Sequence, residues 1–253
     1  MGNSVSDFER NIPAIKTVNP QSFGDSMVVA PHPDDETLGC GGTAAIMLKC
    51  GIHVDFVFVS DGTLSHPGSI KYPAARLRAL REQEALRAVK ILGGNEDDTT
   101  FCAFPDRNVP ARESIYFEAA VRYLYSILTI KKPKTIFIPW ENDPHPDHRA
   151  TFQIVTAAVS SLTTRPSLMQ YPVWFWEMGN QEDVAMIGKM QVCAVDISAT
   201  LPVKLAALKA HESQVTNLID DDPRGFRLSD RMIAHFNHGR EIFFQNLHDQ
   251  VNE

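Results

Sequence analysis

Short apolar runs alternate along the chain with longer segments of helical periodicity. The apolar, β-branched runs predict strands, and apolar residues spaced by three and four positions predict helices. The predicted strands are Met27–Ala30, Val54–Ser60, Thr100–Phe104, Thr135–Pro139 and Gln191–Val195. The predicted helices cover residues 41–50, 74–92, 113–130, 147–162 and 203–217. This alternation predicts an α/β fold with a mainly parallel sheet and helices on both faces.

Nothing in the chain divides it into parts. There is no internal repeat, no low-complexity linker and no shift in composition. We therefore predict a single domain over residues 1–253, with residues 1–24 as a flexible or extended leader. The start of the chain lacks the basic and then apolar layout of a secretory signal peptide.

Composition excludes several classes of protein. The chain carries 24 Lys and Arg against 31 Asp and Glu, and its net charge of −7 argues against a nucleic-acid-binding protein. No apolar run approaches the roughly 18–20 residues that span a bilayer, so no transmembrane segment is expected. The four cysteines have no C-x-x-C spacing, which argues against a thiolate zinc site or a redox pair. Scattered thiols are typical of buried residues in a reducing compartment, and we expect a cytoplasmic protein.

Ionisable side chains gather directly after the first predicted strand. The run Pro31–Glu36 contains His32, Asp34, Asp35 and Glu36. Ligands of open parallel sheets bind beyond the carboxyl ends of the strands, so this run lies where a site is expected. The alternative is a helix N-cap with Asp34 as the capping residue, which leaves His32 without a role.

A second run of this kind follows the predicted strand Thr135–Pro139. It contains His145-Pro146-Asp147-His148 and so repeats the His-Pro-Asp sequence of the first run. Both runs would meet at one edge of the sheet, where they offer histidine, aspartate and histidine. This is a ligand set that zinc accepts in hydrolytic sites, and it predicts a metal-assisted hydrolase. Asp147 would either orient a histidine or cap the following helix.

The helix predicted over residues 74–92 carries charge on its apolar stripe. Arg81 and Glu84 fall in the middle of that stripe, where a charge needs a partner or a function. One interpretation is a buried pair between the two residues. The other is that Arg81 reaches over the edge of the sheet to hold an oxygen of a substrate.

These motifs resemble the LmbE-like/PIG-L family of zinc-dependent N-deacetylases, whose members remove acetyl groups from N-acetylglucosamine carried on larger molecules. The matching positions run from about residue 27 to residue 214, most of the chain. They are Pro31–Gly42, Ser60-Asp61-Gly62, Arg81–Gly93, His145–His148, and Lys204 with His211-Glu212-Ser213-Gln214. The resemblance implies a Rossmann-like sheet with the site at its carboxyl edge.

The resemblance also assigns roles to individual residues. The metal ligands of the family fall on His32, Asp35 and His148. Two histidines and a carboxylate are also the ligand set of non-haem iron sites, so zinc is expected but iron is an alternative.

Three further roles come from the same resemblance. Asp34 would act as the base that takes a proton from water, and a protonated His145 would hold the oxyanion of the intermediate. The proton for the leaving amine would come from His145 or return through Asp34. Arg81 would bind the substrate.

The sequence thus predicts a zinc-dependent amidohydrolase that removes an N-acetyl group from an amino-sugar conjugate of the N-acetylglucosamine type. Its partner would be this small molecule, and assembly into a homo-oligomer is compatible with the resemblance. A rival interpretation is a dinucleotide-binding oxidoreductase, because Gly39–Ala44 matches G-x-G-x-x-A and Asp61 ends a following strand. A non-catalytic sugar-binding protein on the same fold is a third.

Two other features have open interpretations. Trp174 and Trp176 would face one side of a core strand, or form a platform on which a sugar stacks. Asp106 follows a predicted strand, where it would shape a turn or contact the substrate.

Overall fold

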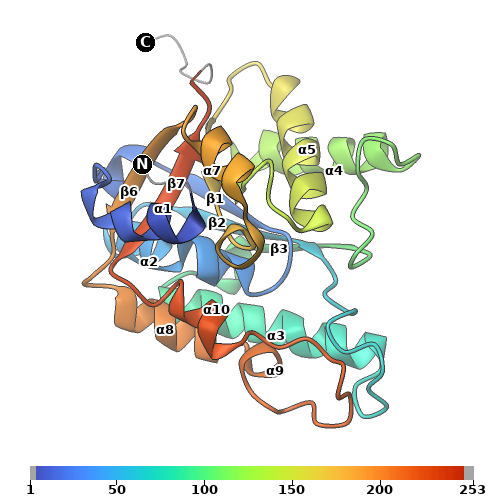
Figure 1. The fold of residues 1–253 in the computed structure, drawn as a ribbon. Helices are drawn as coiled ribbons and strands as arrows, with labels where there is room; N and C mark the ends of the chain where they lie inside the picture. Colours follow the sequence, from blue (N-terminus) through green and yellow to red (C-terminus); the bar gives the residue numbers. More distant parts are fainter. Residues whose placement is uncertain (1–3, 248–253) are drawn as a thin grey trace.

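A seven-stranded sheet runs through the computed structural model, which describes residues 4–247 (Figure 1). Its spatial order is β3-β2-β1-β4-β5-β7-β6. Neighbours from β3 to β5 are parallel, whereas β7 is antiparallel to both β5 and β6, so the prediction of a mainly parallel sheet is confirmed. The strands are β1 (Ser26–Ala30), β2 (Val54–Ser60), β3 (Thr99–Phe104), β4 (Thr135–Pro139), β5 (Ser167–Tyr171), β6 (Gln191–Asp196) and β7 (Arg240–Gln245).

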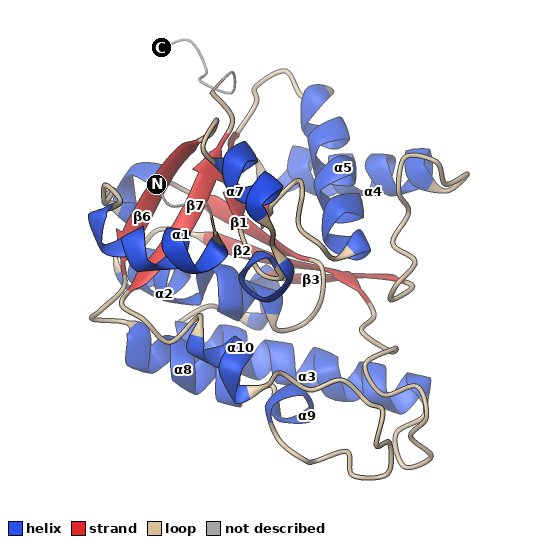
Figure 2. Ribbon diagram, in the orientation of Figure 1, coloured by secondary structure: helices blue, strands red, loops and turns tan. Residues whose placement is uncertain are grey.

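Helices cover both faces of the sheet, as predicted (Figures 1 and 2). One face packs against α2 (Asp35–Lys49), α3 (Ala74–Leu92) and α8 (Leu201–Lys209), and the other against α4 (Phe117–Lys131) and α5 (Pro146–Ser160). The shorter helices are α1 (Val5–Asn11), α6 (Phe175–Met178), α7 (Gln181–Ile187), α9 (Glu212–Val215) and α10 (Asp230–Ala234), with 3-10 turns at Ile12–Ala14, Pro20–Phe23 and Glu96–Asp98.

Side-chain alternation along the buried strands divides the core into two layers. In β1, Val28 belongs to the layer with α2, α3 and α8, whereas Met27 and Val29 belong to the layer with α4 and α5. Every residue of β1 and β2 is buried, which explains why apolar residues make up most of both strands without alternating with polar ones.

Several predicted elements differ from those observed. Helix α2 begins at Asp35 rather than at residue 41, since carboxylates are favourable in a first helical turn. The predicted helix 203–217 is interrupted after α8, and His211 (φ −81°, ψ 55°) separates it from α9. Strands β5 and β7 were not predicted. Strand β7 joins β5 and β6 from a later part of the chain and runs antiparallel to both.

The N-terminal segment packs on the domain instead of forming an extended leader from residue 4 onward. Phe8 of α1 is buried against Phe175, with ring centroids 5.7 Å apart, and against Phe244 at 6.2 Å. Further along, the Val18 amide donates to the Ala194 carbonyl of β6 at 2.8 Å. Apolar side chains of this segment therefore contribute to the core.

Two expectations from composition can be compared with the fold. Within residues 4–247, no helix is long and apolar enough to cross a membrane. All four cysteines are free thiols. Cys40 and Cys193 are buried as expected, whereas Cys102 is half-buried and Cys50 is exposed.

The glycines of α2 allow other elements to approach the helix closely. A Cβ atom at Gly39 would lie 2.3 Å from the Tyr171 ring, and one at Gly42 would lie 2.7 Å from Ile197. Both distances are well inside van der Waals contact. The sequence Gly39–Ala44 therefore lies inside a helix and packs against the core, and it does not form the turn between strand and helix that a dinucleotide pyrophosphate requires.

We expect Gly39→Ala to lower the free energy of unfolding by about 1–3 kcal/mol, the usual cost of overpacking a close-packed core. Urea unfolding followed by circular dichroism would measure the loss. Gly188→Ala is the matched control, because Gly188 has helical angles and an added Cβ would have no neighbour closer than 3.4 Å. Equal stability of the two variants would contradict the close approach at Gly39.

Candidate active site

The two His-Pro-Asp runs meet at one edge of the sheet. Strands β1 and β4 pair in parallel at the centre of the parallel part of the sheet. Strands β2 and β3 follow on one side of β1, and β4 and β5 lie on its other side, so the strand order changes direction between β1 and β4. Such a switch point leaves a crevice at the carboxyl ends of the strands. There the ring centroid of His32 lies 4.9 Å from that of His145 and 5.5 Å from that of His148.

The Asp35 carboxylate lies between two of these histidines. Its Oδ2 is 3.2 Å from His32 Nδ1 and 3.2 Å from His148 Nε2. Two ligand atoms on one tetrahedral zinc ion lie about 3.3 Å apart, given bonds of about 2.0–2.1 Å. The distance from the Asp35 carboxylate to each of the two histidines therefore suits such an ion, and the role of the three residues as metal ligands stays a prediction.

The charges around this point stabilise a cation. Burial opposes protonation of His148, but the Asp35 and Asp143 carboxylates raise its pKa to about 9. Burial also opposes ionisation of Asp35, yet His148 and His32 hold the pKa of its carboxyl well below the usual range. A divalent ion between the same side chains would supply the positive charge that the carboxylates favour.

The ring nitrogens of His148 are completely buried and face carboxylates on both sides. Nε2 lies 3.2 Å from Asp35 Oδ2 and Nδ1 lies 3.4 Å from Asp143 Oδ1, but neither contact has the geometry of a hydrogen bond. A buried polar atom without a hydrogen bond is costly unless something else binds it. A metal ion at Nε2 would satisfy that atom, so the residues present fit a metal site.

Other histidine and aspartate groupings overlap this one. His32, His145 and His148 bring one ring nitrogen each within 4.8 Å of one another, as do the ligand atoms of His32, Asp106 and Asp147. His145 is the least suited ligand, because its Nδ1 already accepts a hydrogen bond from the Asp147 amide at 3.2 Å. The cluster can hold a metal, and its side chains do not fix which metal it is.

Asp34 occupies the N-cap position of α2 but does not cap the helix with its side chain. Its backbone has φ 133° and ψ −28°, a conformation that costs a residue other than glycine about 1–3 kcal/mol. Burial raises the pKa of the Asp34 carboxyl to about 7, although the Arg81 guanidinium opposes the shift. The carboxylate therefore remains available for chemistry, and the capping alternative does not describe its role.

Arg81 is buried, and its guanidinium is directed at the turn that carries Asp34. It donates to the carbonyls of Pro33 at 2.7 Å and Gly62 at 2.9 Å, and its Nη2 lies 3.3 Å from Asp34 Oδ2. The pair predicted between Arg81 and Glu84 does not form, because Glu84 accepts hydrogen bonds from the amide and hydroxyl of Ser213. In this structure Arg81 orders the turn around Asp34, and its contact with a substrate stays a prediction.

His145 caps helix α5 with its own ring, and the Asp147 amide donates to Nδ1. The neutral ring therefore carries its proton on Nε2. Burial lowers the pKa of His145 to about 4, and the neighbouring His148 and His32 lower it further. This environment favours the neutral ring, and the role of a protonated His145 stays a prediction.

Asp147 and Asp106 both lie against His32. Asp147 Oδ2 is 3.2 Å from His32 Nε2 and accepts the Arg107 amide at 2.7 Å, while His145 takes the capping role. Asp106 Oδ1 lies 3.4 Å from the same ring nitrogen, and its other oxygen accepts the Leu64 amide. The geometry favours the alternative in which Asp147 orients a histidine over the one in which it caps helix α5. Asp106 does more than shape a turn, and its position after a strand was the sequence signal for it.

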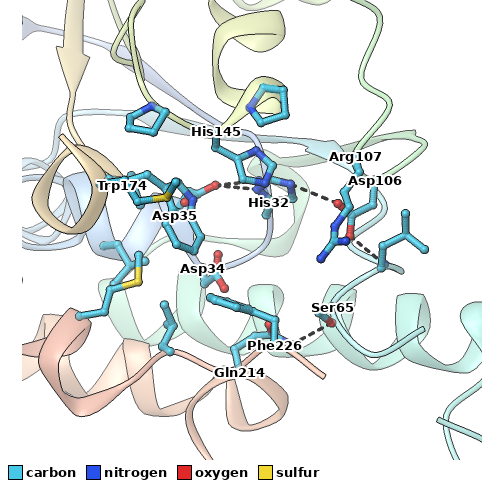
Figure 3. A pocket seen from close by; sticks show the side chains of 18 of the residues that line it. His32, Asp34, Asp35, Ser65, Asp106, Arg107, His145, Trp174, Gln214 and Phe226 are labelled. Carbon is cyan, nitrogen blue, oxygen red and sulfur yellow. Dashed lines mark hydrogen bonds and ion pairs between the residues drawn. The ribbon is translucent and has the colours of Figure 1, made fainter. Parts of the chain in front are cut away.

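A pocket of about 360 Å³ opens over these residues, within the roughly 300–1,000 Å³ range of small-molecule sites (Figure 3). Trp174 and Arg107 lie on opposite sides of His32. The Trp174 ring stacks on the His145 ring with centroids 5.9 Å apart, and its centroid lies 5.5 Å from that of the Phe226 ring. The apolar wall includes Leu38, Leu64, Val173, Trp174, Met178, Phe226, Leu228 and Met232.

The aromatic run around Trp174 is not the core strand that alternation favoured. Strand β5 ends at Tyr171, Trp174 lies in the turn that follows, and Trp176 belongs to α6. The amides of Val173 and Trp174 donate to Asp143 and so bend the chain towards the pocket. Trp174 therefore faces the site, as the platform alternative requires, while Trp176 is buried in the core.

This chain is similar in sequence and in fold to known deacetylases. A deacetylase of Mycolicibacterium smegmatis, 1D-myo-inositol 2-acetamido-2-deoxy-alpha-D-glucopyranoside deacetylase, is 26% identical over 250 residues, covering 81% of this chain and 84% of the relative. Diacetylchitobiose deacetylase of Thermococcus kodakarensis is 27% identical, covering 74% and 69%. The N,N'-diacetylchitobiose deacetylase structure from Pyrococcus horikoshii shares the fold, with a TM-score of 0.64 at 22% identity over 85% of this chain and 80% of that one.

A family profile covers both His-Pro-Asp runs. The PIG-L profile, described as GlcNAc-PI de-N-acetylase, matches residues 27–159, more than half of the 253 residues. Those residues run from β1 to the end of α5 and include all six side chains that the sequence assigned to the site. The protein therefore belongs to the PIG-L family of deacetylases, and it is an amidohydrolase of N-acetyl groups.

Proposed function

We propose that this protein is a zinc-dependent hydrolase that removes the acetyl group from an amino sugar of the N-acetylglucosamine type. The observation that supports the proposal most is that His32, Asp35 and His148 lie together beside the Asp34 carboxylate. This carboxylate does not cap helix α2 and is free to act on a substrate. The relatives support the substrate class, because each is named for a substrate that contains an N-acetylated glucosamine unit.

His32, Asp35 and His148 would hold the metal. A divalent ion bound there supplies Lewis acidity, which polarises a carbonyl oxygen and lowers the pKa of water. Asp147 would orient His32 through Nε2, since a carboxylate behind a metal-binding histidine fixes its tautomer.

Asp34 is the proposed base. One carboxylate oxygen faces Arg81 at 3.3 Å, which leaves the other to accept a proton from the attacking water. Its raised pKa lies near neutral pH, where a group can both take and return a proton.

His145 would stabilise the oxyanion as a neutral donor through Nε2–H. Because Nδ1 accepts the Asp147 amide, the ring has no second proton to give to a leaving amine. Of the two proton routes that the sequence leaves open, this geometry favours the return of the proton through Asp34. Trp174 would pack against the sugar face beside His145.

Metal analysis combined with amine release tests the proposal. We expect about one zinc per chain, release of amine from N-acetylglucosamine conjugates, and loss of release after chelation, with recovery on adding zinc. His148→Ala should bind far less metal than the parent protein. Release that persists without metal, or no metal binding and no release after zinc is added, would overturn the proposal.

A further inference from the structure

A buried acid–base pair beside Asp34 is not used by the proposed reaction. Glu36 lies in the first turn of α2, and His211 lies between α8 and α9. His211 Nε2 is 2.8 Å from Glu36 Oε1, and neither residue has any exposed surface. A carboxylate without solvent contact needs a positive or hydrogen-bonding partner, and His211 provides it.

The other oxygen of Glu36 binds the backbone of Asp34. The Asp34 amide donates to Oε2 at 2.8 Å, and the Thr37 hydroxyl donates to Oε1 at 2.6 Å. A helix start leaves amides without intrahelical partners, and in most helices the N-cap side chain accepts one of them. Here Glu36 accepts an amide hydrogen bond at the start of the helix, and the carboxylate of Asp34 is not used for capping.

Asp34 needs this support because its backbone is strained. Its φ of 133° would relax if the amide lost its acceptor. The Asp34 carbonyl accepts the amides of Thr37 at 3.1 Å and Leu38 at 2.9 Å, and Arg81 holds the preceding carbonyl. The turn is therefore fixed on both sides, by Arg81 and by Glu36 with His211.

Within residues 4–247, the His211 side chain makes one hydrogen bond, to Glu36. Its Nδ1 is buried and has no hydrogen-bond partner among residues 4–247. Packing alone would not place an imidazole with an unpaired nitrogen at a position without solvent contact. The ring is therefore present for its bond to Glu36.

We propose that Glu36 and His211 are positioning residues that hold the Asp34 carboxylate in its catalytic place. This inference rests on the proposed function, in which Asp34 is the base. Neither residue contacts the metal site through its side chain in any interaction seen within residues 4–247. Their hydrogen bonds act on Asp34 through its backbone amide and so on the geometry of the turn.

His211→Leu removes the partner of Glu36 without adding a charge. We expect kcat to fall about 10²-fold, the cost of a displacement of about 1 Å in a catalytic group, with KM and metal content unchanged. His211→Gln, which restores a donor, should recover most of kcat. Crystals of the metal-free His211→Leu protein should show Asp34 displaced from its φ of 133°. If His211→Leu does not fold, Glu36→Met serves instead, because it removes the acceptor of the Asp34 amide at a similar side-chain size, and it should lower kcat in the same way.

Lys204→Met is the matched control. Lys204 is also a buried α8 side chain that binds α2, but it contacts the Leu38 carbonyl and Glu241 and no atom of Asp34. It should lose stability while retaining kcat at a temperature where the protein is folded. An unchanged kcat in His211→Leu, or an equal loss of kcat in Lys204→Met, would overturn the inference. If Asp34→Asn is inactive while His211→Leu is fully active, only the inference fails; if Asp34→Asn is fully active, the proposed function fails.

Discussion

Asp34→Asn is expected to lower kcat for amine release by about 10²–10⁴-fold, the usual contribution of a general base. The amide is nearly the same size as the carboxylate and can still face Arg81, so the fold should be retained. It cannot accept a proton from water at neutral pH. Metal content should stay near that of the parent protein, because Asp34 lies beside the proposed ligands and is not one of them. Steady-state kinetics together with metal analysis measures both quantities.

Asp183→Asn is a suitable control for this substitution. Asp183 is also buried and also lies at a helix start, where its carboxylate accepts the Asn180 amide in a capping box. It does not line the pocket. We expect its kcat to stay near the parent value. Near-native turnover in Asp34→Asn with metal bound would remove Asp34 as the base and with it the proposed mechanism.

The position of the candidate site could be predicted from local sequence. His32 comes two residues after the apolar run that ends at Ala30, and His148 comes nine residues after the run that ends at Pro139. Parallel strands bring their carboxyl ends to one edge. Such a prediction needs only the direction of the strands. Strand direction places both runs at one edge, whereas the pairing of β1 with β4 brings them side by side. The choice of individual ligands came from the family resemblance.

The partners of the charged residues could not be predicted in this way. Helical periodicity placed Arg81 and Glu84 together on a buried stripe, but their partners lie on other elements, at Asp34 and Ser213. Spacing along one helix describes neighbours on that helix only. The sequence placed His211 in a run that matches the family but could not identify its partner, because Glu36 is 175 positions away in the sequence.

The conformation of the turns could not be predicted from the sequence either. Apolar alternation around Trp174 favoured a core strand, whereas hydrogen bonds to Asp143 turn the chain out of the sheet after Tyr171. The strained backbone of Asp34 had no sequence signal at all, since a residue with positive φ is usually glycine. Tertiary contacts determine both features.

The second large effect is expected on stability, at the buried pair of Lys204 and Glu241. Lys204 Nζ donates to Glu241 Oε1 at 2.7 Å and to the Leu38 carbonyl at 2.8 Å. Glu241 in turn accepts the amides of Gly42 and Thr43 within α2. The pair therefore joins α8, β7 and the middle of α2. Because both side chains are almost completely buried, neither charge can turn to water when its partner is removed.

Lys204→Met should lower the free energy of unfolding by about 3–5 kcal/mol, the usual cost of leaving a buried charge without its partner. Lys71→Met is the matched control, because Lys71 pairs with Asp220 at 2.6 Å in a contact with more than half of each side chain exposed. Such surface pairs contribute about 0–1 kcal/mol, so the control should change little. Urea unfolding at neutral pH measures both variants. A similar, small loss in each would mean that Glu241 is stabilised by the α2 amides alone, and the lysine would then not be needed to keep the carboxylate buried.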